Sequence, residues 1–329
     1  MKKIAVLGAG SWGSALASLL CKNGQDVILW SHRESQVVEM ARTGINDKLP
    51  NAHLPANLKF SADLEAAVKD RDLLVIAVPS IAERETAKKI APFIKDGQKI
   101  ITVSKGIEEK TLFTQTEILE EELPNAIVGV LSGPSHAEEV IIGLPTLVVV
   151  GAKDEAFAKE VQQIFANENF RVYTSDDVLG IEIGASLKNV MALAAGMSDG
   201  LGYGDNAKAA LITRGIKEMS ALSVAVGGRP ETLSGLTGVG DLIVTCQSVH
   251  SRNRRAGVYI GEGMAPEEAF DKVKMVVEGA YSAKAALALG EKHHVDLPII
   301  EEVNHVLFDG KDVKTAVYEL MNRSLKPEM

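Results

Sequence analysis

Cysteine is scarce in this 329-residue sequence, and its scarcity bears on both disulfides and metal binding. Only Cys21 and Cys246 occur, with no C-x-x-C pair and no histidine at ligand spacing. This pattern excludes a disulfide scaffold and a zinc site, and we expect no metal. A reducing cytoplasm is the expected compartment.

Positive charge and long apolar runs are also limited. Lysine and arginine total 35 against 44 acidic residues, which gives a net charge of -9 and no general attraction to a nucleic-acid backbone. No uninterrupted apolar run reaches the roughly 18 residues of a membrane span, so neither nucleic-acid binding nor membrane insertion is expected. Residues 1–21 imitate a secretory signal, but glycines interrupt the apolar run and cleavage would remove the strongest motif of the chain.

The first half of the sequence alternates short apolar strands with helical segments. Length and a hydrophobic content of 46% favour two domains with a large core. Strands are expected over 2–8, 26–31, 72–79, 99–106, 126–133, 145–152 and 170–175. Helices are expected over 14–24, 61–70, 82–94 and 154–166. This alternation predicts an α/β fold with a Rossmann-type, doubly wound, mostly parallel sheet.

Beyond about residue 180 the periodicity becomes helical and no convincing strand follows. The helical runs are 182–197, 206–227, 266–273, 280–292 and 312–322. We therefore predict a Rossmann domain over 1–180 and an all-α domain over 181–329.

The strongest motif is GAGSWG, which contains Gly8, Gly10 and Gly13 directly after the first expected strand. In a dinucleotide fingerprint the first glycine permits a tight turn, the second admits the pyrophosphate and the third allows close helix packing. The amino terminus of the following helix then faces the phosphates. A glycine-rich turn without a ligand is the weaker interpretation.

The end of the second strand indicates cofactor choice. An NAD-specific site usually carries a carboxylate here for the ribose 2′-hydroxyl, whereas this sequence reads Ser31, His32, Arg33. Without that carboxylate, Arg33 and His32 could pair with a 2′-phosphate, so we expect NADP(H) to be accepted as well as NAD(H). The alternative is that Arg33 is a solvated cation near the adenine.

Three further patterns predict an anionic substrate. Lys105 and the Gly133 to Ser135 turn follow strand ends, where ligands of open α/β sheets bind, although a strand-end lysine is often merely solvated. Lys188 lies on a helix face that is otherwise small, with Gly184, Ala192 and Gly196 at spacings of four, which implies close approach by another group; a snorkelling surface lysine is the alternative.

The third pattern is the run SRNRR at 251–255, after the glycine-rich segment that contains Asp241. It indicates either a phosphate site or a solvated basic loop.

Five segments together resemble bacterial glycerol-3-phosphate dehydrogenase. They are GAGSWG, VSKGIE, LSGPSHAEEV, KNVMALAAGMSDGLGYGDNAKAALITRG and GLTGVGDLIVTCQSVHSRNRRAG, and they span most of the chain. The resemblance implies NAD(P)H-dependent, reversible reduction of dihydroxyacetone phosphate to sn-glycerol 3-phosphate for glycerophospholipid synthesis. It also implies a cytoplasmic homodimer whose 1–180 domain binds NAD(P) and whose 181–329 domain binds substrate and carries the catalytic lysine.

The resemblance assigns roles to matching positions. The implied cofactor contacts, beside the glycines, are Ser11, Trp12, His32, Arg33, Lys105, Ala137, Arg252, Val276 and Glu278. The implied substrate contacts are Lys105, Gly133, Ser135, Lys188, Asp241, Ser251, Arg252 and Asn253. Two positions depart from the family pattern: Lys48 stands where an aromatic residue is expected, and His136 stands where many relatives have Phe.

The expected mechanism needs few groups. Hydride addition to the ketone carbon places negative charge on its oxygen, which Lys188 would stabilise and protonate, with Lys105 adding positive charge and Asp241 orienting the lysines. Arg252 and its neighbours would hold the phosphate. The alternatives are a related Rossmann dehydrogenase acting on another ketone or hydroxy acid, such as a ketopantoate or hydroxyacyl-CoA enzyme, and a catalytically silent NAD(P)H sensor. The SRNRR run argues against the first alternative, and the two lysines argue against the second.

Overall fold

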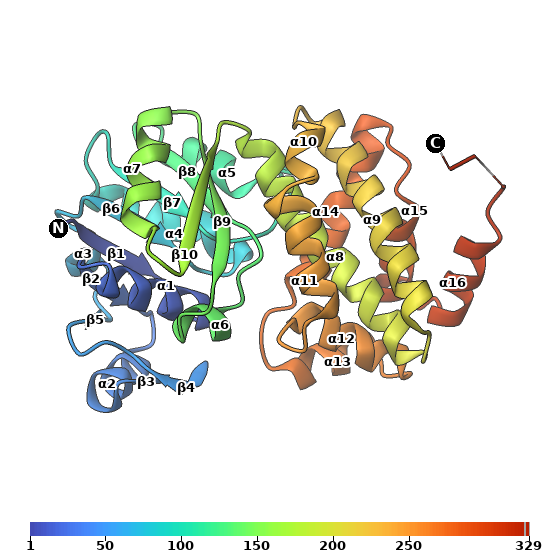
Figure 1. The fold of residues 1–329 in the computed structure, drawn as a ribbon, viewed down its shortest axis with the longest axis horizontal. Helices are drawn as coiled ribbons and strands as arrows, with labels where there is room; N and C mark the ends of the chain where they lie inside the picture. The colour runs from blue at the N-terminus through green and yellow to red at the C-terminus, as the bar shows by residue number, and fades with distance from the viewer. Residues whose placement is uncertain (326, 329) are drawn as a thin grey trace.

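The computed structural model describes residues 1–325, 327 and 328, and it consists of a sheet unit beside a helical unit (Figure 1). The sheet has the order β10-β9-β8-β7-β6-β1-β2-β5. Its strands are β1 (Lys3–Leu7), β2 (Asp26–Trp30), β5 (Lys59–Ser61), β6 (Leu73–Ile76), β7 (Lys99–Thr102), β8 (Ile127–Ser132), β9 (Thr146–Ala152) and β10 (Phe170–Ser175). Neighbouring strands are parallel except β8 and β9, which are antiparallel. The predicted mostly parallel, Rossmann-type sheet is confirmed.

Helices cover both faces of this sheet, so its strands are apolar on both sides. They are α1 (Ser11–Lys22), α2 (Glu34–Thr43), α3 (Leu64–Val68), α4 (Glu83–Ile90), α5 (Gln115–Glu122), α6 (Ala137–Ile141) and α7 (Glu155–Phe165). One core contains α1, α6 and α7 packed on one face, and a second core contains residues of α3, α4 and α5 on the other. The carboxyl ends of β1, β6, β7 and β8 therefore meet at one edge, where the glycine-rich turn, Lys105 and Ser135 lie.

Several local predictions were wrong in extent or missed an element. Residues 61–70 do not form one helix, because Ser61 ends β5 at the edge of the sheet and Asp63 then caps α3 by accepting from Ala66 N. Residues 32–60, for which the sequence predicts no helix or strand, contain α2 and a hairpin of β3 (Ile45–Asn46) and β4 (Leu49–His53). Helix α5 is a further element that the sequence analysis does not predict, although its capping box, Thr114 to Glu117, has the T-x-x-E pattern typical of a helix start.

The helical unit follows from residue 178 onward. It contains α8 (Val178–Gly200), α9 (Asp205–Ala225), α10 (Pro230–Leu233), α11 (Asp241–Gln247), α12 (Arg252–Gly261), α13 (Pro266–Val273), α14 (Glu278–His293), α15 (Pro298–Phe308) and α16 (Val313–Met321). A π-helical turn at Leu236–Gly240 precedes α11. The all-α character predicted beyond the sheet is confirmed for the residues that the structure describes. The predicted domain boundary at residue 180 falls in the first turn of α8 and stays a prediction.

Helix α8 is the core of the helical unit. It is long and apolar enough to cross a membrane by length and composition, but 94% of its most apolar 18-residue window is buried by the protein itself. Helices α9, α11, α12, α14 and α15 surround it. Burial of this kind is typical of a central helix in a globular domain.

Helices α8 and α12 cross with their backbones in contact. A Cβ atom at Gly196 would lie 2.1 Å from the carbonyl oxygen of Arg254, and one at Gly257 would lie 2.2 Å from that of Leu193. The helices that carry Lys188 (α8) and Arg252 (the start of α12) therefore pack backbone against backbone. The close approach predicted from the small residues around Lys188 is made, at Gly196, by a neighbouring helix.

Candidate active site

A cavity of about 230 Å³ lies where the carboxyl ends of the sheet meet the helical unit. Residues from both units line it. The predicted site residues among them are Gly10, Ser11, Trp12, Lys105, Ser135, Ala137, Lys188, Ser251, Arg252, Asn253, Val276 and Glu278. Residues that are separated by more than 200 positions in the sequence thus meet at one place.

The glycine-rich turn gives the sheet side of this cavity its shape. Gly8 has a φ of 118°, and a Cβ there would lie 2.5 Å from the carbonyl oxygen of Ala77. A Cβ at Gly13 would lie 2.0 Å from the carbonyl oxygen of Gly8, whereas nothing lies within 4 Å of a Cβ at Gly10. The turn is therefore closed toward the protein and open outward at Gly10, at the amino terminus of α1, where backbone N–H groups are available to an anion.

Two lysines and one aspartate form the polar centre of the cleft. Lys188 Nζ donates to Asp241 Oδ1 at 2.6 Å and to Thr245 Oγ1 at 2.8 Å. Lys105 Nζ donates to Asp241 Oδ2 at 2.7 Å and to the carbonyl oxygen of Gly133 at 3.1 Å. Asp241 does not line the cavity but lies behind it, and it holds one lysine from each unit.

Burial sets the electrostatics of this cluster. Burial lowers the pKa of Lys188 to about 8, against the opposing attraction of Asp241 and with a further lowering from Lys105. Burial by itself would raise the pKa of Asp241, but the charges of Lys105 and Lys188 hold it below its ordinary value. A lysine in this state can release and regain a proton near neutral pH, as a general acid or base requires.

The SRNRR segment separates into residues with different roles. Ser251 caps α12 by accepting from Arg254 N, and Arg254 pairs with Asp199 at 2.6 Å. Asn253 joins α12 to its neighbours: its Nδ2 donates to Asn189 Oδ1 and its Oδ1 accepts from Gly279 N, both at 2.9 Å. Among the described residues, the Arg252 guanidinium has no ion-pair or hydrogen-bond partner, although burial lowers its pKa. A partly buried guanidinium without a protein partner is suited to an anionic ligand.

Glu278 links the two units at the edge of the same cavity. It accepts from Ser80 N at 3.2 Å and from Ser80 Oγ, and burial raises its pKa while these bonds oppose the rise. Trp12 Nε1 is buried on the sheet side and has no partner among the described residues. The indole N–H and the open turn at Gly10 are features that fit a bound dinucleotide.

The residues at the end of β2 lie outside this cavity. His32 and Arg33 are exposed, and Arg33 N donates to Ser31 Oγ at the turn into α2. Their position after β2 is compatible with the far end of a dinucleotide that begins at Gly10.

Sequence reasoning missed several residues of the cleft. Thr245 contacts Lys188 and lies four positions after Asp241 on α11, a spacing that places both on one helix face. Asn189 and Glu138 line the cavity beside residues that were predicted, and His250 lines it from the loop before Ser251. Of these, only the Asp241 to Thr245 spacing carries a signal in the sequence.

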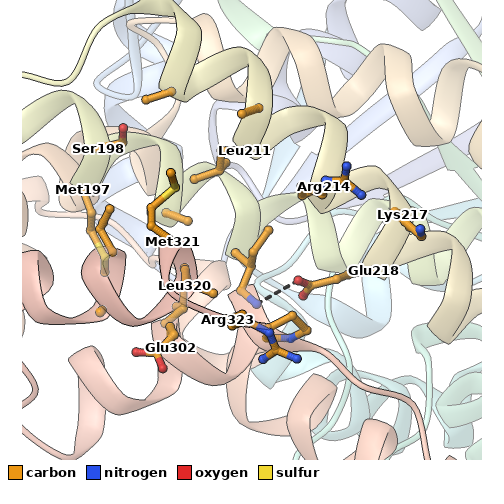
Figure 2. Close-up of a pocket in the computed structure, with 18 of the residues that line it drawn as sticks. Met197, Ser198, Leu211, Arg214, Lys217, Glu218, Glu302, Leu320, Met321 and Arg323 are labelled. Carbon is orange, nitrogen blue, oxygen red and sulfur yellow. Dashed lines mark hydrogen bonds between the residues drawn. The ribbon is translucent and has the colours of Figure 1, made fainter. Parts of the chain in front are cut away.

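A second and larger cavity, about 740 Å³, lies between α9, α15 and α16 (Figure 2). Aliphatic side chains such as Met197, Leu211 and Leu320 line most of it. None of the predicted site residues lines this groove.

Comparisons with known proteins agree with the predicted resemblance. A family model described as the amino-terminal part of NAD-dependent glycerol-3-phosphate dehydrogenase matches residues 3–158, and the model of its carboxyl-terminal part matches 177–318. A glycerol-3-phosphate dehydrogenase [NAD(P)+] of Agathobacter rectalis is 58% identical over all of this chain and 98% of the relative. The corresponding Bacillus subtilis protein is 51% identical over all of this chain and 96% of the relative.

Among solved structures, some resemble this chain in both sequence and fold, and others resemble it in fold alone. The crystal structure of glycerol-3-phosphate dehydrogenase from Coxiella burnetii has a TM-score of 0.95 and 41% identity, covering 98% of this chain and 99% of that one. A ketopantoate reductase from Ralstonia eutropha has a TM-score of 0.63 and 19% identity, covering 97% of this chain and all of the other. The second similarity concerns the fold alone.

Proposed function

This chain belongs to the NAD-dependent glycerol-3-phosphate dehydrogenase family, and from that membership we propose that it reduces dihydroxyacetone phosphate to sn-glycerol 3-phosphate with NADH or NADPH. The observation that carries the proposal is the buried pairing of Lys188 and Lys105 with Asp241, in the same cavity as the unpaired Arg252. These groups supply a proton donor near the ketone and a cation for the phosphate. The family assignment removes the ketopantoate and hydroxyacyl-CoA alternatives.

Lys188 is the proposed proton donor. Reduced nicotinamide, when bound, supplies the hydride that forms the new C–H bond at the ketone carbon. The carbonyl electron pair moves to the oxygen, and Lys188 Nζ gives that oxygen its proton. Lys105 stabilises the developing negative charge, and Asp241 fixes the positions of both ammonium groups through the bonds described above. In the reverse direction neutral Lys188 accepts the proton from the hydroxyl.

Arg252 is the proposed phosphate ligand. It begins α12, its partly buried guanidinium has no partner among the described residues, and it lines the cavity with Lys188. Holding the phosphate would orient the ketone carbon and reduce the entropic part of the barrier. Ser251, Gly133 and Ser135 are proposed to add short donors and backbone groups around the substrate. Asn253 is proposed to act there while it joins α12 to α8 and α14.

The cofactor is proposed to lie along the carboxyl edge of the sheet. Its pyrophosphate would rest on the turn of Gly8, Gly10 and Gly13, where Gly10 leaves the outer side open. Contacts would continue through Ser11, Trp12, Ala137, Val276 and Glu278, and Arg252 and Lys105 would contact both ligands. His32 and Arg33 would meet the ribose end.

We also propose a cytoplasmic homodimer that supplies glycerophospholipid synthesis. Both cysteines are buried and free, which is consistent with a reducing compartment. The burial of α8 is consistent with a protein that does not insert into membranes. Light scattering coupled to size-exclusion chromatography tests the dimer, and a mass of one 35.1 kDa chain at all concentrations would contradict it.

The decisive test of the activity compares two ketones. Loss of reduced-nicotinamide absorbance is followed with dihydroxyacetone phosphate and with unphosphorylated dihydroxyacetone, using NADH and NADPH in turn. We expect rapid turnover with the phosphate ester and a much lower kcat/KM with the free ketone, because only the ester can engage Arg252. Equal kcat/KM values for the two ketones would overturn the assigned substrate.

A further inference from the structure

Two imidazoles face each other across the cleft, one from each unit. His136 follows Ser135 in the loop between β8 and α6, and His250 precedes Ser251 in the loop between α11 and α12. Their ring centroids lie 5.8 Å apart with planes inclined by 54°. Both rings line the cavity that contains Lys188 and Arg252. The pair therefore lies beside the groups proposed to bind the substrate, and nothing in the proposed mechanism uses it.

The His136 ring carries an unsatisfied polar atom. Its Nε2 is buried and has no hydrogen-bond partner among the described residues. A buried polar nitrogen without a partner costs free energy comparable to a lost hydrogen bond. Because this nitrogen belongs to a ring lining the cavity, a ligand bound there is a ready source of the missing partner.

Charged groups on three elements act on this imidazole. Burial lowers the pKa of His136, and the positive charge of Lys188 on α8 lowers it further. Glu138 and Glu139 on α6 and Asp241 on α11 oppose this shift. The other titratable group against the ring is His250. The ring is therefore neutral at neutral pH before an anion enters, and an added negative charge in the cavity would favour its protonated form.

We propose that His136, packed against the ring of His250, forms a proton-coupled clamp on the phosphorylated substrate, in which His136 Nε2–H donates to a substrate oxygen and His136 takes up one proton on binding. The proposal rests on the substrate class proposed above. The clamp contributes to binding and not to proton transfer at the ketone.

The sign of the pH dependence follows from linkage. A dianion that raises the pKa of His136 binds more tightly as pH falls toward the pKa of His136 in the free enzyme. A phosphate ester loses its own second charge near pH 6, which acts in the opposite direction. The histidine contribution is therefore isolated by dividing the KM of a variant by that of the unmodified enzyme at each pH.

The first test is this ratio between pH 5.5 and 8.5, measured with dihydroxyacetone phosphate. His136→Phe keeps a ring of similar size and removes the N–H, and His250→Gln removes the ring packed against it at an exposed position where folding is not at risk. If binding raises the pKa of His136 by one unit, the KM ratio for His136→Phe should rise toward about tenfold at the acid end of this range and fall below about twofold at pH 8.5, with kcat nearly unchanged. The double variant should match His136→Phe, because the proton is taken up by His136.

His293→Phe on α14 is the matched control, since His293 does not line the cavity. Its KM ratio should stay near one at every pH. A KM ratio for His136→Phe that is the same at all pH values, or a loss confined to kcat, would overturn the clamp.

A second readout does not depend on turnover. The imidazole resonances of the unmodified protein are titrated by NMR with and without sn-glycerol 3-phosphate, and the signals missing in His136→Phe and His250→Gln assign the pair. We expect the apparent pKa of His136 to rise by about one unit with the ligand. No rise with the ligand bound would contradict the clamp, whereas absent turnover of dihydroxyacetone phosphate by the unmodified enzyme would contradict the proposed function separately.

Discussion

The groove of the helical unit and the cleft beside the sheet differ in size and in how their polar groups are satisfied. The groove between α9, α15 and α16 measures about 740 Å³ and the cleft beside the sheet about 230 Å³. In the groove, where Figure 2 labels Glu218 and Arg323, Glu218 accepts from the backbone N–H groups of Ile299 and Ile300, and Arg323 pairs with Asp296. In the cleft, Arg252 and His136 Nε2 have no partner among the described residues. The groups proposed to bind the substrate therefore include polar atoms that no protein group satisfies, whereas the groove residues Glu218 and Arg323 are paired within the protein.

Replacing Lys188 in the cleft with Met should cause the largest loss of activity among the substitutions considered for the two cavities. The change keeps much of the side-chain length but removes the proton donor, so kcat for ketone reduction should fall by about 10² to 10⁴-fold. NADPH binding should survive, because the glycine-rich turn lies in the other unit. Single-turnover rates and a NADPH titration of the same variant measure both. Normal NADPH binding with more than about a tenth of the original rate would leave Lys188 a structural residue.

Replacing Arg252 with Ala should give the next largest effect. Losing a hydrogen-bonded charge typically costs about 1.5 to 3 kcal/mol, which is roughly 10 to 150-fold in kcat/KM for the phosphorylated ketone. Most of the loss should appear in KM, with a smaller fall in kcat because the substrate is less well oriented. Arg252→Lys should recover only part of the loss, since an ammonium cannot reproduce bidentate geometry. An unchanged kcat/KM would remove Arg252 from the phosphate site.

Alkaline pH should lower the rate of ketone reduction by the unmodified enzyme. Burial lowers the pKa of Lys188 to about 8, and only its protonated form can donate to the ketone oxygen. The kcat/KM for reduction should therefore be level below that pKa and fall by about tenfold per pH unit above it. Oxidation of sn-glycerol 3-phosphate needs the neutral lysine and should show the opposite slope. A reduction profile that stays flat to pH 10 would contradict the role of Lys188 as the acid.

Replacing Arg33 with Asp should affect one cofactor only. The residue is exposed at the turn after β2, so its contribution should lie near the lower end for a charged hydrogen bond, about tenfold in the Kd for NADPH. NADH binding should change little because NADH lacks the 2′-phosphate. Fluorescence titrations with both cofactors test this prediction, and equal losses would contradict it.

A substitution in the groove should have the smallest catalytic effect. Leu320→Ala removes part of the aliphatic lining on α16, which should lower Tm by about 2 °C through lost packing. The kcat/KM should stay within about twofold of the original value, because no residue of the proposed mechanism lines the groove. A large loss of activity in a variant with nearly normal Tm would show that the groove takes part in function.

The sheet and the chemistry of the cleft were predictable to different extents. Apolar strands and the GAGSWG turn are local patterns, so the order of elements and the placement of Gly8 and Gly13 follow from short stretches of sequence. The short edge strand β5 and the antiparallel β9 depend on neighbouring strands and were not distinguishable in advance. The small-residue face of α8 correctly predicted close approach, but its partner at Gly196 is the backbone of α12.

Contacts between distant residues limited the prediction of the site itself. Lys105 and Asp241 are 136 positions apart, and no spacing in one sequence reveals their hydrogen bond. Family resemblance placed both residues in the site, but only the structure shows that Asp241 holds both lysines from behind. The unpaired state of Arg252 and the pairing of Arg254 with Asp199 likewise depend on packing, because both arginines occur in the same SRNRR run.

The crossing of α8 and α12 fixes the separation of two helix backbones at the proposed site. Backbone atoms lie in close contact at Gly196 and Gly257, so the separation of the backbones that carry Lys188 and Arg252 is fixed by two main chains. At the proposed site we expect the best fit for a ketone whose carbonyl and phosphate match the resulting separation of the two side chains. We therefore expect discrimination among homologous ketones to depend on the separation of α8 and α12. A methyl group added at Gly196 should change that separation without changing any group proposed to touch the substrate.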